Sequence, residues 1–192
     1  MGGRTPAPVN DAYTYYSDQG LRDCFKMIVN LFYLTLVLSI LLSALVAGLV
    51  FGFAAVVMPG INKLSDRDFL LAFKHMDEVI QNNQPVFMLV WTGSIVLVTG
   101  TLILGTLILS GGQIYLLWVA SALYLLGVQL PTVRCNIPLN NTLQDLDIIR
   151  LSESELAKSR REFEMPWTRW NIFRTLNAIA AVLAWLLLLI QL

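Results

Sequence analysis

Long apolar runs alternate with short polar segments along the chain. No charged residue occurs between Lys26 and Met58, and three further apolar runs follow, at about residues 86–109, 114–133 and 172–190. A helix needs ~20 apolar residues to cross a ~30 Å hydrocarbon core. We therefore predict four membrane spans, at about 31–58, 86–109, 114–133 and 172–190.

Composition assigns the class of protein. Of the 192 residues, 56% are hydrophobic and 14% are charged, and the mean hydropathy is +0.65, whereas soluble domains carry about 25% charged residues. The pattern predicts an integral, multi-pass membrane protein whose surroundings are the lipid bilayer. Lys plus Arg (13) equals Asp plus Glu (13), so no net field attracts nucleic acid, and we expect no nucleic-acid partner.

The first 26 residues are polar and contain Pro6, Pro8 and Gly20, which are expected to break any long helix. We predict a polar tail over residues 1–26 and a single membrane domain over 27–192. Pro59-Gly60 is expected to end the first span. The small residues Ala44, Gly48 and Gly52 recur every four positions, a pattern that favours close packing within the bundle over dimerisation.

Two polar connections carry helix-start signals. Ser65 with Asp68 precedes an amphipathic segment, 65–81, in which Phe69, Phe73, Met76 and Ile80 are expected to lie opposite Asp66, Lys74, Asp77 and Glu78. Ser152 with Glu155 begins a charged helix that Met165-Pro166 is expected to stop. The fold class is therefore all-α: a polytopic membrane four-helix bundle, with an amphipathic surface helix between spans 1 and 2 and a helical loop between spans 3 and 4.

The positive charges predict the orientation. The connections 59–85 and 134–171, counted through Arg174, hold ten Lys and Arg residues, and the opposite side holds three. Because Lys and Arg favour the cytoplasmic side, we expect both termini to be non-cytoplasmic. We also expect the 65–81 helix and the 134–170 connection to pack together at one end of the bundle.

Polar residues gather at the ends of two spans. Asn136, Pro138 and Asn140 follow the third span, and Pro138 is expected to end the helix there. Before the fourth span, Trp167, Asn171 and Arg174 share one helical stripe, with Trp170 at its border. The stripe is either an inward-facing site, with Arg174 pairing Asn136, Asn140 or a carboxylate, or an interfacial anchor of tryptophans and an arginine that reaches lipid headgroups.

These motifs resemble a known family. Val57-Met58-Pro59, Phe73-Lys74-His75-Met76-Asp77, Asn136-Ile137-Pro138-Leu139-Asn140-Asn141 and the Trp167–Thr175 segment, in this order, are similar to the anthrone oxygenase-like family of membrane proteins over about residues 45–190. The resemblance implies a four-helix fold and, for some members, oxidation of a tricyclic anthrone to an anthraquinone. Some relatives carry a His one turn before the final Arg, where this chain has Asn171.

Two functional classes are possible. In the first, the protein binds a small lipophilic, quinone- or anthrone-like molecule, with Asn136, Asn140, Trp167, Trp170, Asn171 and Arg174 as binding residues. An oxygenase of this type would need a proton acceptor, for which His75, Asp77 and Glu78 are the candidates, with His75 put forward first. No metal-ligand cluster or nucleotide motif is present in the sequence, so we expect no metal and no cofactor. In the second class, the same residues hold the loop on the bundle, and the protein is a non-catalytic subunit of a membrane complex or a homo-oligomer.

Overall fold

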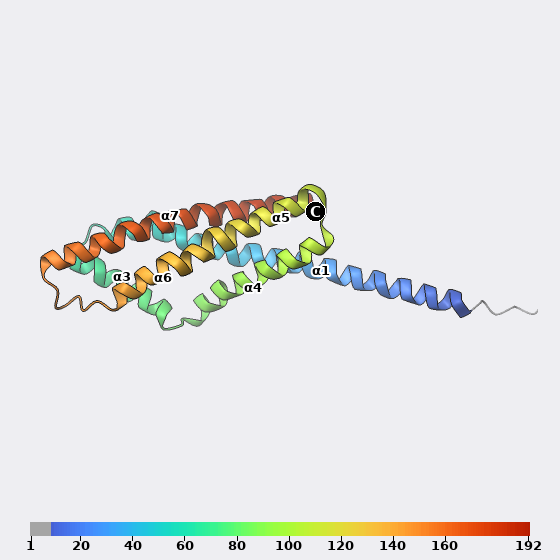
Figure 1. Cartoon of the computed structure of the whole chain (residues 1–192), viewed down its shortest axis with the longest axis horizontal. Helices are drawn as coiled ribbons and strands as arrows, with labels where there is room; N and C mark the ends of the chain where they lie inside the picture. Colours follow the sequence, from blue (N-terminus) through green and yellow to red (C-terminus); the bar gives the residue numbers. More distant parts are fainter. Residues whose placement is uncertain (1–8) are drawn as a thin grey trace, which may run out of the picture.

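Four long apolar helices make up the bundle (Figure 1). The structure is a computed structural model that describes residues 9–192, with side chains from residue 19 on. The four helical segments that are long and apolar enough to cross a membrane are 19–61, 85–108, 111–144 and 153–191. The predicted all-α class is confirmed, and the first, third and fourth helical segments are longer than the apolar runs alone indicated.

Short π-helical turns lie within the first and third of these segments. The first segment comprises α1 (Val9–Gly52), a π-helical turn η1 (Phe53–Val57) and α2 (Met58–Ile61); α3 (Asp66–Gln81) and α4 (Pro85–Ile108) come after it. The third segment comprises α5 (Gly111–Tyr124), the π turns η2 (Leu125–Gln129) and η3 (Thr132–Asn136), and α6 (Ile137–Gln144); α7 (Glu153–Gln191) ends the chain.

The polar tail over residues 1–26 stays a prediction as a unit of the chain, but the expectation that Gly20 breaks a long helix there is wrong. Helix α1 begins at Val9 and passes through Gly20 without a break, and it extends beyond the other helices (Figure 1). A single glycine inside a helix costs only about 1 kcal/mol relative to alanine, which a continuous helix of 44 residues tolerates. Residues 1–8 lie outside the described part of the chain.

The core of the bundle lies where α1, α4, α5 and α7 meet. Phe32, Leu117, Tyr124 and Trp185 are fully buried there. The closest approach is at Gly105, where an added Cβ would stand 2.7 Å from the Phe32 ring and closer still to Leu117. The expectation for Ala44, Gly48 and Gly52 is wrong. Neither glycine of that stripe has a neighbour within 4 Å of an added Cβ, because the stripe faces away from the core.

Three prolines are accommodated by widened turns rather than by helix ends. The residue before each proline donates its amide to the carbonyl five residues back: Met58 to Phe53, Leu130 to Leu125 and Ile137 to Thr132. In an α-helix, the proline ring would clash with the carbonyl four residues back. Because a π turn is wider, it separates the two groups. The expected helix ends at Pro59 and Pro138 are therefore wrong, since the helices continue to Ile61 and Gln144.

Helix α7 also continues past its proline. The expected stop at Met165-Pro166 is wrong, because α7 runs unbroken from Glu153 to Gln191. Pro166 removes a single amide donor, the one that would bond the carbonyl of the exposed Glu162. On either side of it, Phe163 and Trp167 are buried in one apolar cluster, and this packing holds the two halves in line.

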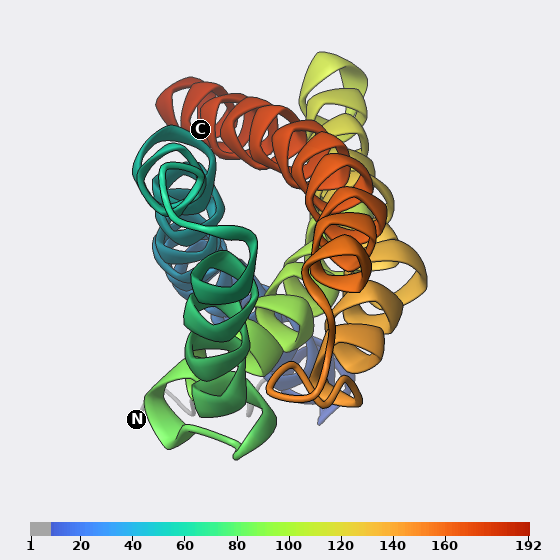
Figure 2. The same ribbon diagram turned by 90° about the vertical axis from the view of Figure 1, so that its left-hand side faces the viewer.

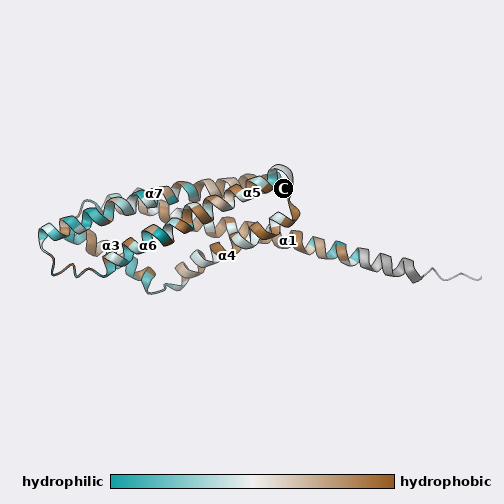
Figure 3. Cartoon of the chain, viewed as in Figure 1, coloured by the Kyte–Doolittle hydropathy of each residue, from teal (hydrophilic) through white to brown (hydrophobic). Residues whose placement is uncertain are grey.

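The polar elements assemble at one end of the bundle, as predicted. Ser65 caps α3 by accepting the amide of Asp68, and Ser152 forms a capping box with Glu155 at the start of α7. Figure 2 looks along the bundle from this end, with α3 and the loop before α7 nearest the viewer. Hydrophilic residues gather here, whereas α4 and α5 are largely hydrophobic (Figure 3).

Two partly buried cations hold this end together. Arg160 of α7 donates to Glu164, to Asp66 and to the backbone before α3, and it lies 4.4 Å from the centre of the Phe69 ring. Lys74 of α3 donates to the carbonyls of Gln144 and Leu146, at 2.6 and 2.8 Å. These contacts fix α3 against α6 and α7, and so position α3 as one wall of a cavity.

Candidate functional site

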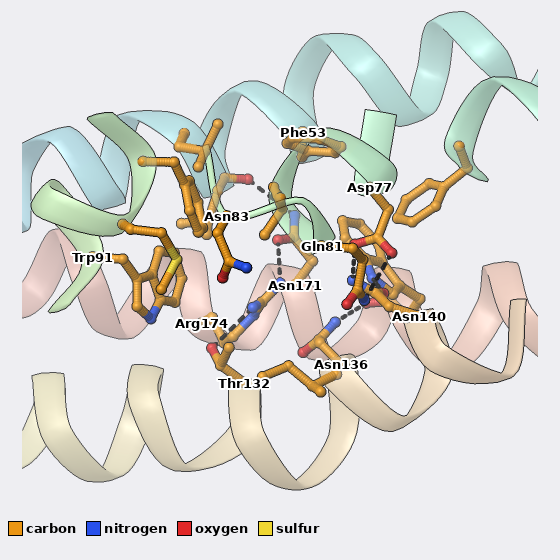
Figure 4. Close-up of a pocket in the computed structure, with 18 residues that line it drawn as sticks. Phe53, Asp77, Gln81, Asn83, Trp91, Thr132, Asn136, Asn140, Asn171 and Arg174 are labelled. Atoms are coloured by element: carbon orange, nitrogen blue, oxygen red, sulfur yellow. Dashed lines mark hydrogen bonds between the residues drawn. The ribbon is translucent and has the colours of Figure 1, made fainter. Parts of the chain in front are cut away.

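A cavity of about 340 Å³ lies between α3 and the four long helices. Its walls come from the end of α1 and η1, the buried face of α3, the start of α4, the segment 132–140, and α7 (Figure 4). Five residues that the sequence indicated as binding residues line it together: Asn136, Asn140, Trp167, Asn171 and Arg174.

Arg174 is buried, with 5% of its surface exposed. Its guanidinium donates to the hydroxyl of Thr132 and to the side-chain oxygen of Asn171, both at 2.9 Å. The expectation that Arg174 does not reach for lipid headgroups is confirmed. The expected partners Asn136, Asn140 and a carboxylate are wrong, because the nearest acceptors come from the neighbouring η3 turn and from the same face of α7.

Asn171 joins α7 to α1 at this point. Its amide nitrogen donates to the carbonyl of Val50 in α1, at 2.9 Å, while its oxygen accepts from Arg174. Both hydrogen-bonding ends of the amide are therefore used, and only 1% of the residue is exposed. This fixes the position of the guanidinium relative to α1.

Asp77 of α3 is the carboxylate of the cavity, with 4% of its surface exposed. One oxygen accepts from the Asn140 amide at 2.7 Å, and the other accepts from Gln144 at 2.9 Å and from Gln81 at 3.2 Å. Asn140 in turn accepts from the Trp167 indole at 2.8 Å. A buried carboxylate is thus held by neutral amides from α3 and α6, and this network fixes the orientation of both Asp77 and Asn140.

Two buried polar atoms in the cavity wall have no partner. The Arg174 Nε–H donor and the Asn136 Oδ1 acceptor are inaccessible to solvent and have no hydrogen-bond partner among the described residues. An unsatisfied buried polar group costs about 1–3 kcal/mol. Both residues line the cavity, so a small rotation of each side chain would present one spare donor and one spare acceptor to a bound molecule.

The rest of the wall is apolar and aromatic. Phe53, Phe73 and Trp167 pack edge-on or tilted, with ring centres 5.0–6.2 Å apart. On the α4 side, Phe87 stacks on Trp91 with ring centres 5.4 Å apart. A cavity lined by aromatic and apolar side chains with a few polar atoms is typical of small-molecule sites.

The cavity is open to the surface of the protein. Its exposed lining residues are Leu49, Gln81, Asn83, Met88 and Ile137. Met88 of α4 and Ile137 of α6 are apolar and are 37% and 41% exposed, and α4 makes no substantial contact with η3 or α6. Both residues belong to helical segments that are long enough to span a membrane.

Two of the residues proposed from the sequence lie elsewhere. Trp170 is 39% exposed and packs against Phe173 on the outer surface. The His75 side chain is 72% exposed, 3.5 Å from Glu78, and it does not line the cavity. Asp77 lies on the buried face of α3, so its expected place opposite the apolar residues is wrong. One signal was available, because Asp77 follows Phe73 by four residues and so shares its face.

Other lining residues carry no signal in the sequence. Thr132, Gln81 and Trp91 contribute a hydroxyl, an amide and an aromatic face, but isolated residues of these types in or near apolar runs form no distinctive pattern. Among the residues from 19 onward, no three His, Cys, Asp or Glu side chains gather in a way that could hold a metal ion. The polar groups of the cavity suit the oxygen atoms of an organic molecule.

The fold and the cavity define an integral membrane protein with a four-helix bundle and a buried, partly polar site at one end. The chain belongs to the anthrone oxygenase family, whose model matches residues 87–184, just over half of the chain. The match includes the cavity residues of α4, η3, α6 and α7 but not Asp77 or the α1 residues. No curated protein and no solved structure matches the chain.

Proposed function

We propose that the protein binds a flat, lipophilic ring ketone of the anthrone type in this cavity and oxygenates it. The observation that carries the proposal is the pairing of aromatic walls with one unsatisfied donor, on Arg174, and one unsatisfied acceptor, on Asn136. A hydroxylated ring ketone supplies the complementary groups, because its carbonyl accepts from the guanidinium and its hydroxyl donates to the amide oxygen. Membership of the anthrone oxygenase family supports the same class of substrate.

The reaction is the conversion of a ring methylene to a carbonyl by dioxygen. One oxygen atom becomes the new carbonyl oxygen on the former methylene carbon, and the other leaves as water with the two methylene hydrogens. The substrate therefore supplies all four electrons that reduce dioxygen. The role of this chain is to bind the ring between Phe53, Trp167 and Trp91 and to stabilise negative charge on the ketone oxygen through Arg174.

The substrate enters from the bilayer in this proposal. A tricyclic ketone is concentrated in the membrane by its apolar surface, and the exposed apolar residues Met88 and Ile137 in the cavity wall support a mouth that opens to lipid between them. Entry through the membrane places the flat ring directly between the aromatic walls. The polar groups then orient it, since they lie deeper among α3, η3 and α7.

The first test is binding to the purified protein in detergent. Anthraquinone, the product-like probe, is expected to quench tryptophan fluorescence in a saturable way, because Trp167 and Trp91 line the cavity. Trp167→Phe should remove much of that quenching. The matched control is Trp170→Phe, which changes the same residue type three positions away on the exposed surface and should leave the binding curve unchanged.

The second test is turnover. Purified protein with anthrone should consume one dioxygen per anthraquinone formed, above the background of protein-free detergent. Asn136→Leu should raise KM, because it removes the spare acceptor. If neither quenching nor oxygen uptake exceeds the background, the proposed function is wrong, and a non-catalytic role in a membrane complex is the remaining interpretation.

A further inference from the structure

The cavity holds a carboxylate that is not paired with a cation. None of the ion pairs between described side chains includes Asp77, although only 4% of its surface is exposed. All three of its hydrogen-bond partners are amide donors, which is the arrangement that an ionised carboxylate requires. A buried charge held only by neutral groups is costly to maintain, so a role in the chemistry of the site is a physical reason for its presence.

The three amides leave one hydrogen-bond acceptor position of the Asp77 carboxylate unoccupied. Its two oxygens offer about four lone-pair positions, and three are used, one by Asn140 and two by Gln144 and Gln81. Trp167 fixes Asn140 by donating to its oxygen. Asp77 therefore has a fixed orientation and one free acceptor position, and it lines the cavity.

We propose that Asp77 is the catalytic base, which takes the proton from the ring methylene of the bound ketone. This inference rests on the proposed function and deepens it. In the step, the C–H bond breaks and an O–H bond forms on the carboxylate, while the electron pair of the C–H bond moves through the ring to the ketone oxygen. The resulting enolate is the species that reacts with dioxygen.

The two charged groups of the cavity suit this division of roles. Asp77, Gln81 and Asn140 lie on one side of the cavity, and Arg174 and Thr132 on the other (Figure 4). The proton is thus taken on one side, and the negative charge develops beside the unbonded Nε–H of Arg174. The separation lets one ring molecule contact both groups.

The other titratable groups near Asp77 are occupied or face away. Lys74 donates to two backbone carbonyls, while His75 and Glu78 pair with each other on the exposed face of α3. Helix α7 contributes Arg174, and the cavity residues of α1, α4 and α6 are uncharged. His75 is therefore replaced by Asp77 as the candidate proton acceptor.

The test is deuterium exchange of the anthrone methylene in D2O without oxygen, monitored by NMR. The anaerobic assay isolates proton removal from oxygenation. Wild-type protein should accelerate exchange over protein-free detergent, and Asp77→Asn should lose at least about a hundredfold of that acceleration, the lower range for a general base. Glu78→Gln, which removes the neighbouring exposed carboxylate, should exchange like the parent.

A second variant guards against misfolding of Asp77→Asn, which places an amide among amide donors. Gln81 is exposed, and Gln81→Leu removes one donor to the carboxylate. Because this amide helps to hold the carboxylate in its orientation, its loss should lower the rate of deuterium exchange several-fold at a fixed pH while saturable quenching by anthraquinone is retained. A merely structural role of Asp77 predicts no fall in the exchange rate of this folded variant.

The outcomes separate this inference from the proposed function. Binding without exchange in the wild type, wild-type exchange rates in folded Asp77→Asn, or an unchanged exchange rate in Gln81→Leu would each overturn the role of Asp77 while leaving binding intact. If anthraquinone does not quench Trp167, the proposed function fails, and the role of Asp77 fails with it. Loss of exchange with retained quenching in Asp77→Asn supports the inference.

Discussion

The stability of the protein should fall less on the loss of Arg174 than on the loss of its neutral partner Asn171. Arg174 is buried without a carboxylate partner and is held by two neutral acceptors. Replacing it with methionine, Arg174→Met, removes a guanidinium that costs about 2.5–3.5 kcal/mol to place in a membrane. The same change loses two hydrogen bonds to a charged donor, worth about 1.5–3 kcal/mol each. These effects largely offset each other, so the free energy of unfolding should change by less than about 3 kcal/mol.

Asn171→Leu should lower the free energy of unfolding by more than Arg174→Met does. The substitution removes the bond to the Val50 carbonyl and leaves the buried guanidinium with Thr132 alone. Leaving a buried charge incompletely paired costs about 3–5 kcal/mol. The double variant should then be more stable than Asn171→Leu alone, because the methionine removes the charge that the leucine left unpaired.

Melting in detergent measures this order. At about 2–4 °C per kcal/mol for a chain of this size, Asn171→Leu should melt about 6–20 °C below the parent, and Arg174→Met should stay closer to it. Asn177→Ala, whose amide donates only to a carbonyl of its own helix, is the control and should cost under about 1 kcal/mol. If Arg174→Met melts lower than Asn171→Leu, or if the two effects simply add, Arg174 has an anionic partner and the reasoning is wrong.

Three further outcomes are expected. Arg160→Ala should lower the melting temperature by about 5–10 °C, because the several hydrogen bonds of its guanidinium join α7 to the start of α3, whereas Lys158→Ala, at an exposed ion pair, should change it little; equal effects would contradict this. Met88→Trp should slow anthraquinone association by narrowing the mouth, whereas Leu89→Trp, one position away and 71% exposed, should not; identical rates would rule out entry there. Cysteines placed beside Lys74 and Lys158 should be labelled from one side of the membrane, and labelling from opposite sides would refute the topology.

Much of the architecture could be predicted because its causes are local. Ser65 and Ser152 cap their helices through residues three positions on, and the spans are recognisable by their uninterrupted apolar length. The inward stripe of Trp167, Asn171 and Arg174 is a consequence of the helical period. Each of these features depends on neighbours in sequence, so one sequence is enough to find it.

The site was only partly predictable, because its details depend on contacts between distant segments. Trp167 and Trp170 stand about 60° apart around α7, and only the position of α3 decides that the first is buried and the second exposed. Likewise, Arg174 finds Thr132 as a partner because η3 passes beside α7. The neighbouring helix, and not the local pattern, selects these contacts.

The number of residues in each π turn determines the direction in which the following cavity side chains point. Each such turn holds more residues than an α-helical turn, and η1 and η3 supply Phe53, Thr132 and Asn136 to the cavity. Deleting one residue from η3, with Pro138 replaced by alanine, would let the helix rewind as a regular α-helix and would rotate α6 by about 100° about the helix axis. Asn140 would then turn away from Asp77 without any change in its own identity. At each wide turn, a single deletion would thus change which side chains face the interior of the bundle, while the helix itself stays continuous.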